Sequence, residues 1–189
     1  MLRDLIRENR SYRRFHQDVP IEMETLRALV DLARLSASGM NLQPLKFVLS
    51  SDPGRNALIF PCLAWAGYLK DWPGPVEGER PPAYIVILGD TRIRRSFGCD
   101  HGIAAQSILL GATEWGLGGC MIGSVKRDQL FEALDIASHY ELLLVLALGK
   151  PKETVVIDPL AAGGDIKYWR DENQVHHVPK RSLDEIIVG

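Results

Sequence analysis

Apolar positions recur at helical spacing in two segments near the start of the chain. Leu2, Leu5 and Ile6 fall on one face of a short opening helix. Pro20 introduces a second helix, with acidic residues suited to its first turn. Its apolar positions are Leu26, Leu29, Val30 and Ala33. The pattern predicts two helices, of which the second gives way to a loop rich in Ser, Gly and Asn over residues 36–44.

Continuous apolar runs predict the strands. A short strand is expected over residues 47–49, and buried strands over 83–89 (AYIVILG) and 142–149 (LLLVLALG). Between them, residues 100–115 predict a helix of about 24 Å that is rich in small residues. A short charged helix is expected over 127–134. Because helices and strands interleave, the sequence predicts one α+β or α/β domain.

Three segments are less regular. Residues 55–70 are predicted to be helical and to end at the sequence YLKDW. Four prolines exclude a regular element from residues 73–82, which we interpret as a surface loop or lid. Residues 151–189 show little periodicity until their end, and they are typical of a tail laid over another surface.

Composition narrows the functional class. Hydrophobic residues make up 46% and charged residues 24% of the 189, as in an ordinary globular protein. The 22 basic and 24 acidic residues alternate along the chain and give a net charge of −2, which argues against nucleic-acid binding. The chain has three widely spaced cysteines, no apolar leader at its start and no run long enough to span a bilayer. We expect a soluble cytoplasmic protein.

The sequence NRSYRRF, residues 9–15, holds the densest cluster of cations. Arg10 and Arg13 are three positions apart and would share a face if the first helix persisted. Guanidinium groups offer paired, planar donors that suit phosphate. The alternative interpretation is a solvated helix face.

The glycine-rich sequence GLGGCMIG, residues 116–123, is not a dinucleotide motif. In GxGxxG phasing a third glycine would stand at Met121, and the stretch leads from a helix into a strand, opposite to the required order. It can instead bring bare backbone N–H groups close to a flat ligand, or serve as a tight entry into a buried strand. No metal-ligand spacing and no nucleophilic triad is present, so neither chemistry is predicted.

Four stretches taken in order resemble the FMN-dependent nitroreductase family. They are NRSYRRF, LARLSASGMNLQPLKFV, DHGIAAQSILLGATEWGLGGCMIGS and HVPKRSLDEII. The match that they carry extends over nearly the whole chain and is weakest between residues 55 and 82. The resemblance implies an α+β fold of α/β/α layers, with a central mixed sheet and a long helix at the centre of a homodimer. It implies a single FMN-binding domain over 1–189, of which 151–189 wraps the partner subunit.

The resemblance also implies which residues bind FMN. The arginine stretch and the basic pair near the C-terminus would hold the phosphate and ribityl chain, with Arg13 also near the ring. The loop at 38–41 would reach the flavin of the other subunit, and the backbone of Ile122 and Gly123 would face N5 and O4. The implied set is Arg10, Ser11, Tyr12, Arg13, Ser38, Gly39, Met40, Asn41, Gln43, Cys120, Met121, Ile122, Gly123, Lys180 and Arg181.

The implied activity is hydride transfer from NAD(P)H through flavin N5 to a nitroaromatic, quinone or similar acceptor. No catalytic residue is expected, because the cofactor carries the chemistry. Trp65, Tyr68 and Trp72 are candidates for an apolar wall of the substrate pocket, or for core and loop-anchoring aromatics. Two alternatives stay open: a specialised flavin-dependent dehydrogenase or dehalogenase of one metabolite, and a flavin carrier or sensor without turnover.

Overall fold

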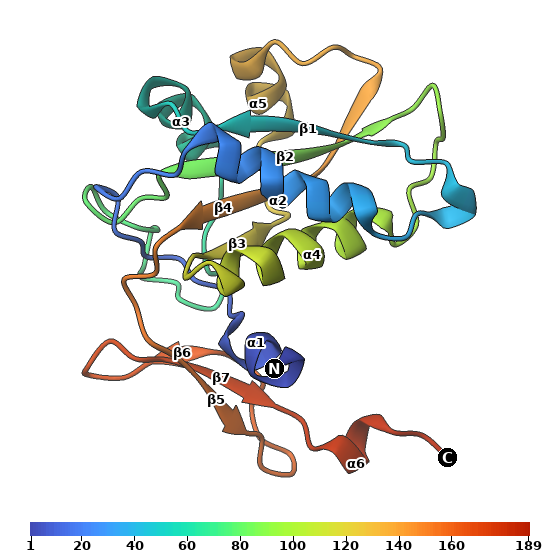
Figure 1. Cartoon of the computed structure of the whole chain (residues 1–189). Helices are drawn as coiled ribbons and strands as arrows, with labels where there is room; N and C mark the ends of the chain where they lie inside the picture. Colours follow the sequence, from blue (N-terminus) through green and yellow to red (C-terminus); the bar gives the residue numbers. More distant parts are fainter.

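An antiparallel sheet of four strands forms the centre of the computed structural model, which describes residues 1–189 (Figure 1). The spatial order is β1-β2-β4-β3, and each neighbouring pair is antiparallel. The layered α+β class is confirmed, but the expected mixed sheet is wrong within this chain, because β4 lies between β2 and β3 and runs opposite to both. The strands are β1 (Leu45–Ser50), β2 (Ala83–Asp90), β3 (Gly118–Ile122) and β4 (Tyr140–Gly149).

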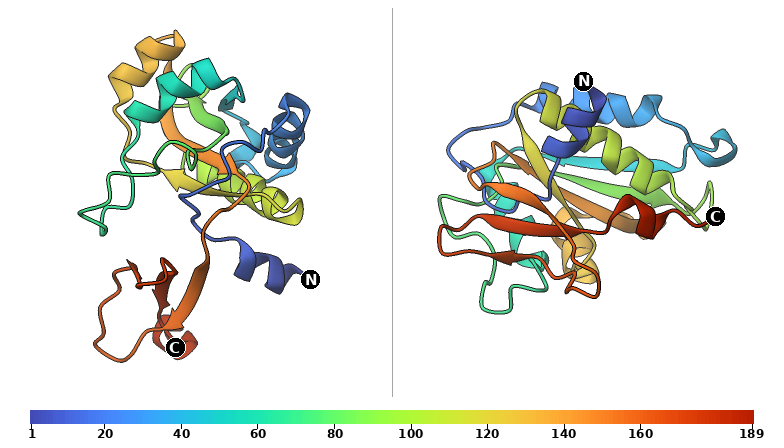
Figure 2. Two further views of the ribbon diagram at one scale, coloured as in Figure 1. Left: turned by 90° about the vertical axis from the view of Figure 1, so that its left-hand side faces the viewer. Right: turned by 90° about the horizontal axis from the view of Figure 1, so that it is seen from below.

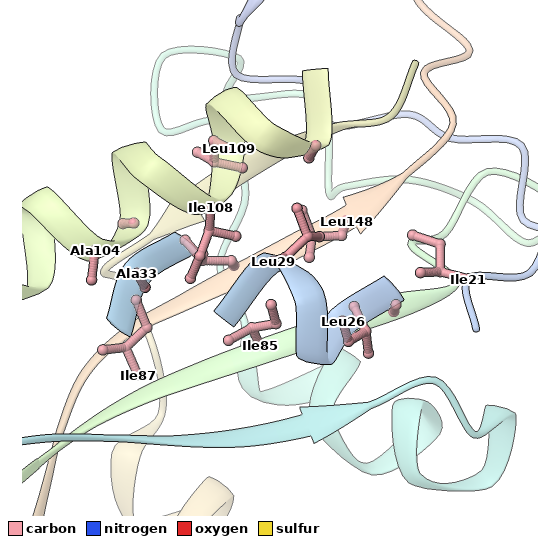
Figure 3. Close-up of a cluster of buried hydrophobic side chains, with 14 residues drawn as sticks. Ile21, Leu26, Leu29, Ala33, Ile85, Ile87, Ala104, Ile108, Leu109 and Leu148 are labelled. Atoms are coloured by element: carbon pink, nitrogen blue, oxygen red, sulfur yellow. The ribbon is translucent and has the colours of Figure 1, made fainter. Parts of the chain in front are cut away.

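Two helices, α2 (Met23–Leu35) and α4 (Asp100–Glu114), cover one face of this sheet (Figure 3). Their contact is close because α4 presents small side chains to α2. A Cβ at Gly111 would lie 2.2 Å from Cδ1 of Leu32. Part of the small-residue pattern therefore serves packing within the chain, while Gly102 stays exposed. No helix combines the length and the apolar character needed to cross a membrane.

The other face is covered by α3 (Pro53–Ile59), the short 3₁₀ helix η2 (Phe60–Cys62) and α5 (Arg127–Leu134). The prediction of a helix through residue 70 is wrong, because α3 ends at Ile59. Pro61 lies in η2, where it lacks the N–H that a continuing helix would need. The chain then turns extended at Leu63, which is buried.

The C-terminal residues form an arm with a small sheet of its own, which the sequence pattern did not predict. Its order is β5-β7-β6, with β5 parallel to β7. Figures 1 and 2 show this arm standing apart from the central sheet. Several large apolar side chains on it are exposed, among them Trp169 and Ile186. The elements of the arm are β5 (Val155–Pro159), β6 (Trp169–Arg170), β7 (His176–Lys180) and α6 (Leu183–Ile186).

Candidate functional site

The arginine stretch runs beside β3 as an extended segment. Helix α1 (Leu2–Glu8) ends before it, and Asn9 is extended, with φ −71° and ψ 98°. Ser11 pairs with Gly119 in a parallel bridge, and the Tyr12 N–H donates to the Gly119 carbonyl at 3.0 Å. The expectation that a persisting first helix places two arginines on one face is therefore wrong.

Arg10 and Arg13 nevertheless line one cavity of about 380 Å³, between α1, α4, β3 and the arm. Ser11, Met121 and Lys180 line it as well, so five predicted residues meet there. Three of the lining side chains are cations and none is a carboxylate. Such a cavity suits an anion.

Arg10 carries a donor without a partner. Its Nη2 donates to the carbonyl of Ile6 at 2.6 Å, but its Nε is buried and has no hydrogen-bond partner. Burial lowers the pKa of the Arg10 guanidinium. Because a buried charged donor is costly to leave unsatisfied, an acceptor entering the cavity would be stabilised here.

Arg13 is also free of carboxylate partners at its guanidinium. Its Nη1 donates to the Ser11 carbonyl at 3.2 Å and lies 3.3 Å from Nε2 of His176. The guanidinium also lies over the ring of Tyr168, 4.9 Å from its centroid. Burial, followed by the charges of Arg13 and Arg170, lowers the pKa of His176 to about 4, so this histidine is neutral at pH 7.

Arg14, which was left outside the predicted site, turns away from the cavity. Its Nε and Nη2 donate to both carboxylate oxygens of Glu79, at 2.6 and 2.7 Å. The hydrogen bonds from Arg14 hold the pKa of Glu79 below its usual value, against the effect of burial. The third arginine of the cluster therefore has a structural partner.

A narrower cleft of about 130 Å³ adjoins the cavity, since Arg13 and Met121 line both. Residues 64–67, including Trp65, form one side, and residues 120–124 form the other. A Cβ at Gly123 would meet only Cδ2 of Leu144, at 4.0 Å. Backbone is thus open to a ligand at this position.

Gly118 and Gly119 of the motif have a structural role, because neither position has space for a side chain. A Cβ at Gly118 would lie 2.5 Å from Cδ2 of Tyr12, and one at Gly119 would lie 2.6 Å from the carbonyl oxygen of Ala147. Tight packing explains these two positions, whereas Gly123 is not required by packing. The tight-entry interpretation of the motif therefore holds at Gly118 and Gly119, while the approach of a ligand at Gly123 stays a prediction.

Several predicted residues lie outside the two cavities. The hydroxyl of Tyr12 donates to the Glu8 carbonyl at 2.9 Å, and Arg181 pairs with the carboxylate of Glu185. Tyr68 packs on Tyr168 with ring centroids 4.9 Å apart.

The predicted aromatic wall is therefore incomplete. The ring of Trp72 lies under the guanidinium of Arg170, at 4.2 Å, which makes it a loop-anchoring aromatic. Of the three aromatics, only Trp65 lines the cleft.

The predicted loop at residues 38–43 is attached to the start of α4. Ser38 Oγ and the Gly39 N–H donate to the buried Asp100 carboxylate at 2.6 and 2.9 Å. Burial acts to raise the pKa of Asp100, yet these hydrogen bonds hold it below its ordinary value. Met40 and Asn41 both have φ 55°. None of these loop residues lines the arginine cavity of its own chain.

Three cavity residues from the arm, Tyr168, His176 and Val178, were missed by sequence reasoning, which treated them as tail residues. The period-two pattern of β7 offered a signal. His176, Val178 and Lys180 alternate along the strand and all line the cavity. Tyr168 had no comparable signal, because it precedes a strand of two residues.

Comparisons with known proteins identify the family and the fold. The family model described as "Nitroreductase family" matches residues 6–64 and 77–150, a span that includes the arginine stretch and β3. The Bacillus subtilis (strain 168) protein YodC, whose name describes a candidate NAD(P)H nitroreductase, is 25% identical over 177 residues. The match covers 78% of this chain and 88% of that protein.

Solved structures show the same fold. An FMN-dependent nitroreductase from Clostridium difficile R20291 is 25% identical with a TM-score of 0.66, over 79% of this chain and 87% of that one. A candidate nitroreductase from Exiguobacterium sibiricum 255-15, solved in complex with FMN, is 19% identical with a TM-score of 0.68, over 81% and 89% of the two chains. Since the family model matches well over half of its residues, this chain belongs to the nitroreductase family.

Proposed function

We propose that this protein is an FMN-dependent oxidoreductase that uses NAD(P)H to reduce a nitroaromatic, quinone or similar small acceptor. The observation that carries the proposal is the pairing of two adjoining spaces. One is a cationic cavity with an unsatisfied buried donor on Arg10, and the other is a cleft bordered by the open backbone of Gly123. Membership of the nitroreductase family supports the same conclusion.

The residues present fit FMN. Arg10 and Lys180 would hold the phosphate, since charge-assisted hydrogen bonds to phosphate are strong and the cavity has no competing carboxylate. Arg13 lies between the two spaces and would contact both the chain and the ring of the cofactor. The backbone at Ile122 and Gly123, with Met121 and Cys120, would face the ring.

When bound, FMN supplies the hydride chemistry through its N5 atom. The chain contributes position and charge. The Arg13 cation would favour negative charge on the adjacent ring edge. Trp65 would close one side of the cleft and reduce the access of water. The protein needs no acid or base of its own for this reaction.

We also propose a homodimer with two such sites. The loop at 38–41, tied to α4 through Asp100, would contact the flavin of the partner, and the arm would extend over the partner's surface. The left-handed backbone at Met40 and the 88% exposure of its side chain are consistent with a loop shaped to contact another molecule.

The test is steady-state oxidation of NADH and NADPH by the flavin-loaded protein, with and without a nitroaromatic or quinone acceptor. We expect acceptor-dependent oxidation with at least one donor. Bound FMN without acceptor-dependent turnover would support a carrier or sensor instead. Turnover restricted to one metabolite in a product survey would support the specialised enzyme.

A further inference from the structure

The carboxylate of Glu153 lies beside the arginine stretch with 1% of its side chain exposed. Its Oε1 accepts hydrogen bonds from two successive backbone N–H groups, those of Arg13 and Arg14, the latter at 3.1 Å. Its Oε2 accepts from Nη2 of Arg170 at 2.9 Å. None of these contacts uses the Arg13 guanidinium. Glu153 therefore holds the backbone of Arg13 while leaving the cationic side chain to the cavity.

This contact restrains the backbone between two points that are hydrogen-bonded elsewhere. On one side Tyr12 is tied to β3, and on the other the Arg14 carbonyl accepts a hydrogen bond from the Lys152 N–H at 2.9 Å. Between them, the carboxylate holds two successive peptide N–H groups. Because peptide units are planar, holding both restrains the dihedral angles of Arg13 and hence the direction in which its side chain leaves the backbone.

The second oxygen of Glu153 connects this segment to the arm. Arg170 comes from β6, and its guanidinium also lies 4.2 Å from the ring centroid of Trp72. With 9% of its side chain exposed, Arg170 has the Glu153 carboxylate as its ion-pair partner. Removing one partner of a buried ion pair leaves an uncompensated charge, so this arrangement depends on Glu153.

We propose that Glu153 is a positioning residue for the FMN site, acting through Arg13. It fixes the backbone from which Arg13 reaches the cavity, and it holds the arm against that backbone. The inference rests on the proposed function, since it assumes that FMN is the ligand that Arg13 contacts.

Glu79 provides a matched control. It is a second poorly exposed carboxylate beside the same stretch, with 13% of its side chain exposed. Its contacts are to the side chain of Arg14, at 2.6 and 2.7 Å, and to Nζ of Lys152 at 3.5 Å. It makes no contact with the Arg13 backbone amide. Loss of Glu79 should affect stability without changing the site.

The experiment is a double-mutant cycle read by FMN affinity, with full-length protein stripped of flavin and titrated with FMN. The variants are Glu153→Ala, Arg13→Ala, their combination, and Glu79→Ala. We expect Glu153→Ala to weaken FMN binding at least about tenfold in the wild-type background and less than about threefold in the Arg13→Ala background. Glu79→Ala should change the affinity by less than about twofold.

An equal effect of Glu153→Ala in both backgrounds, or no effect, would overturn the positioning role. An equal loss of FMN affinity in Glu79→Ala would also overturn the positioning role, since general destabilisation would then explain the effect of Glu153→Ala. If Glu153→Ala does not fold, Glu153→Met is measured against the same criterion, because it fills the space of the side chain but offers no oxygen to the two amides. Wild-type protein that does not bind FMN would refute the proposed function itself, whereas failure of the cycle alone refutes only the role of Glu153.

Discussion

Nη1 of Arg13 lies 3.3 Å from Nε2 of His176, which brings a residue of the N-terminal segment into contact with a buried histidine of the arm. The histidine is 1% exposed, and its Nδ1 has no partner. Burial and the nearby cations disfavour the charged imidazolium, and the contact with Arg13 favours the neutral ring. Docking of the arm beside Arg13 therefore favours the neutral form of this histidine.

This pairing predicts a pH dependence of stability. The pKa of His176 is lowered from 6.5 to about 4 in the folded protein. Between pH 6.5 and about 4, His176 is protonated in the unfolded chain but neutral in the folded chain. The free energy of unfolding therefore falls as the pH drops through this window. We expect His176 to account for a loss on the order of 2–3 kcal/mol in the free energy of unfolding.

The measurement is urea unfolding of the flavin-free protein between pH 7 and pH 4, compared with His176→Gln. Gln retains an amide near Arg13 but does not titrate, so the variant should lose less stability on acidification. Parallel pH profiles for the two proteins would contradict the assignment to His176.

Arg13→Ala should weaken FMN affinity at least about tenfold, because a hydrogen bond to a charged group contributes roughly 1.5–3 kcal/mol. Fluorescence titration of the flavin-free protein with FMN measures this affinity. Arg14→Ala is the matched control, since Arg14 belongs to the same stretch but bonds Glu79. We expect the control to lower the free energy of unfolding by roughly 1–3 kcal/mol and to keep its flavin. Equal FMN retention in both variants would be inconsistent with the assigned roles.

Gly123→Val should remove bound flavin while the fold persists. The new side chain would meet only Leu144 at 4.0 Å within the protein, yet it would occupy the cleft. Flavin content and thermal unfolding are measured together. Gly119→Ala gives the opposite control, because its Cβ would lie 2.6 Å from a backbone oxygen and should destabilise the fold. A stable, flavin-loaded Gly123→Val protein would show that this strand end is only structural.

The flavin-loaded protein should be a dimer at micromolar concentration. A dimer interface would bury exposed apolar residues on the arm and on α4, such as Trp169 and Ile103, and obligate interfaces usually bury more than about 2,000 Å². Light scattering should give about twice the chain mass of 21.1 kDa. A monomer that still holds FMN stoichiometrically would refute the shared site and the roles of Ser38 and Asn41.

Local sequence patterns predicted much of the fold because the apolar periodicity of each helix or strand lies within its own segment. The helices at 100–115 and 127–134 and the strand at 83–89 were located within a residue or two from apolar periodicity alone. The predicted helix through residue 70 is wrong because Pro61 interrupts helical hydrogen bonding inside an apolar segment. Cys62 and Leu63 are buried there without an α-helical backbone.

The candidate site was only partly predictable, because its geometry depends on contacts between distant segments. Arg10, Arg13 and Lys180 stood out as cations and do meet in one cavity. Their meeting depends on an extended segment paired with β3, which replaced the expected helical face. The bond from Glu153 to the Arg13 amide spans 140 positions along the chain, and no local pattern marks it.

The central claim is that the cationic cavity and the adjoining cleft bind FMN, and its most direct test is flavin stoichiometry. The purified protein is examined by visible absorption, stripped, and titrated with FMN, with riboflavin as a ligand that lacks the phosphate. We expect a yellow protein with about one FMN per chain, and riboflavin binding at least about tenfold weaker because it cannot satisfy Arg10 and Lys180. A colourless protein that takes up no FMN on titration, or one that binds riboflavin equally well, would contradict the account.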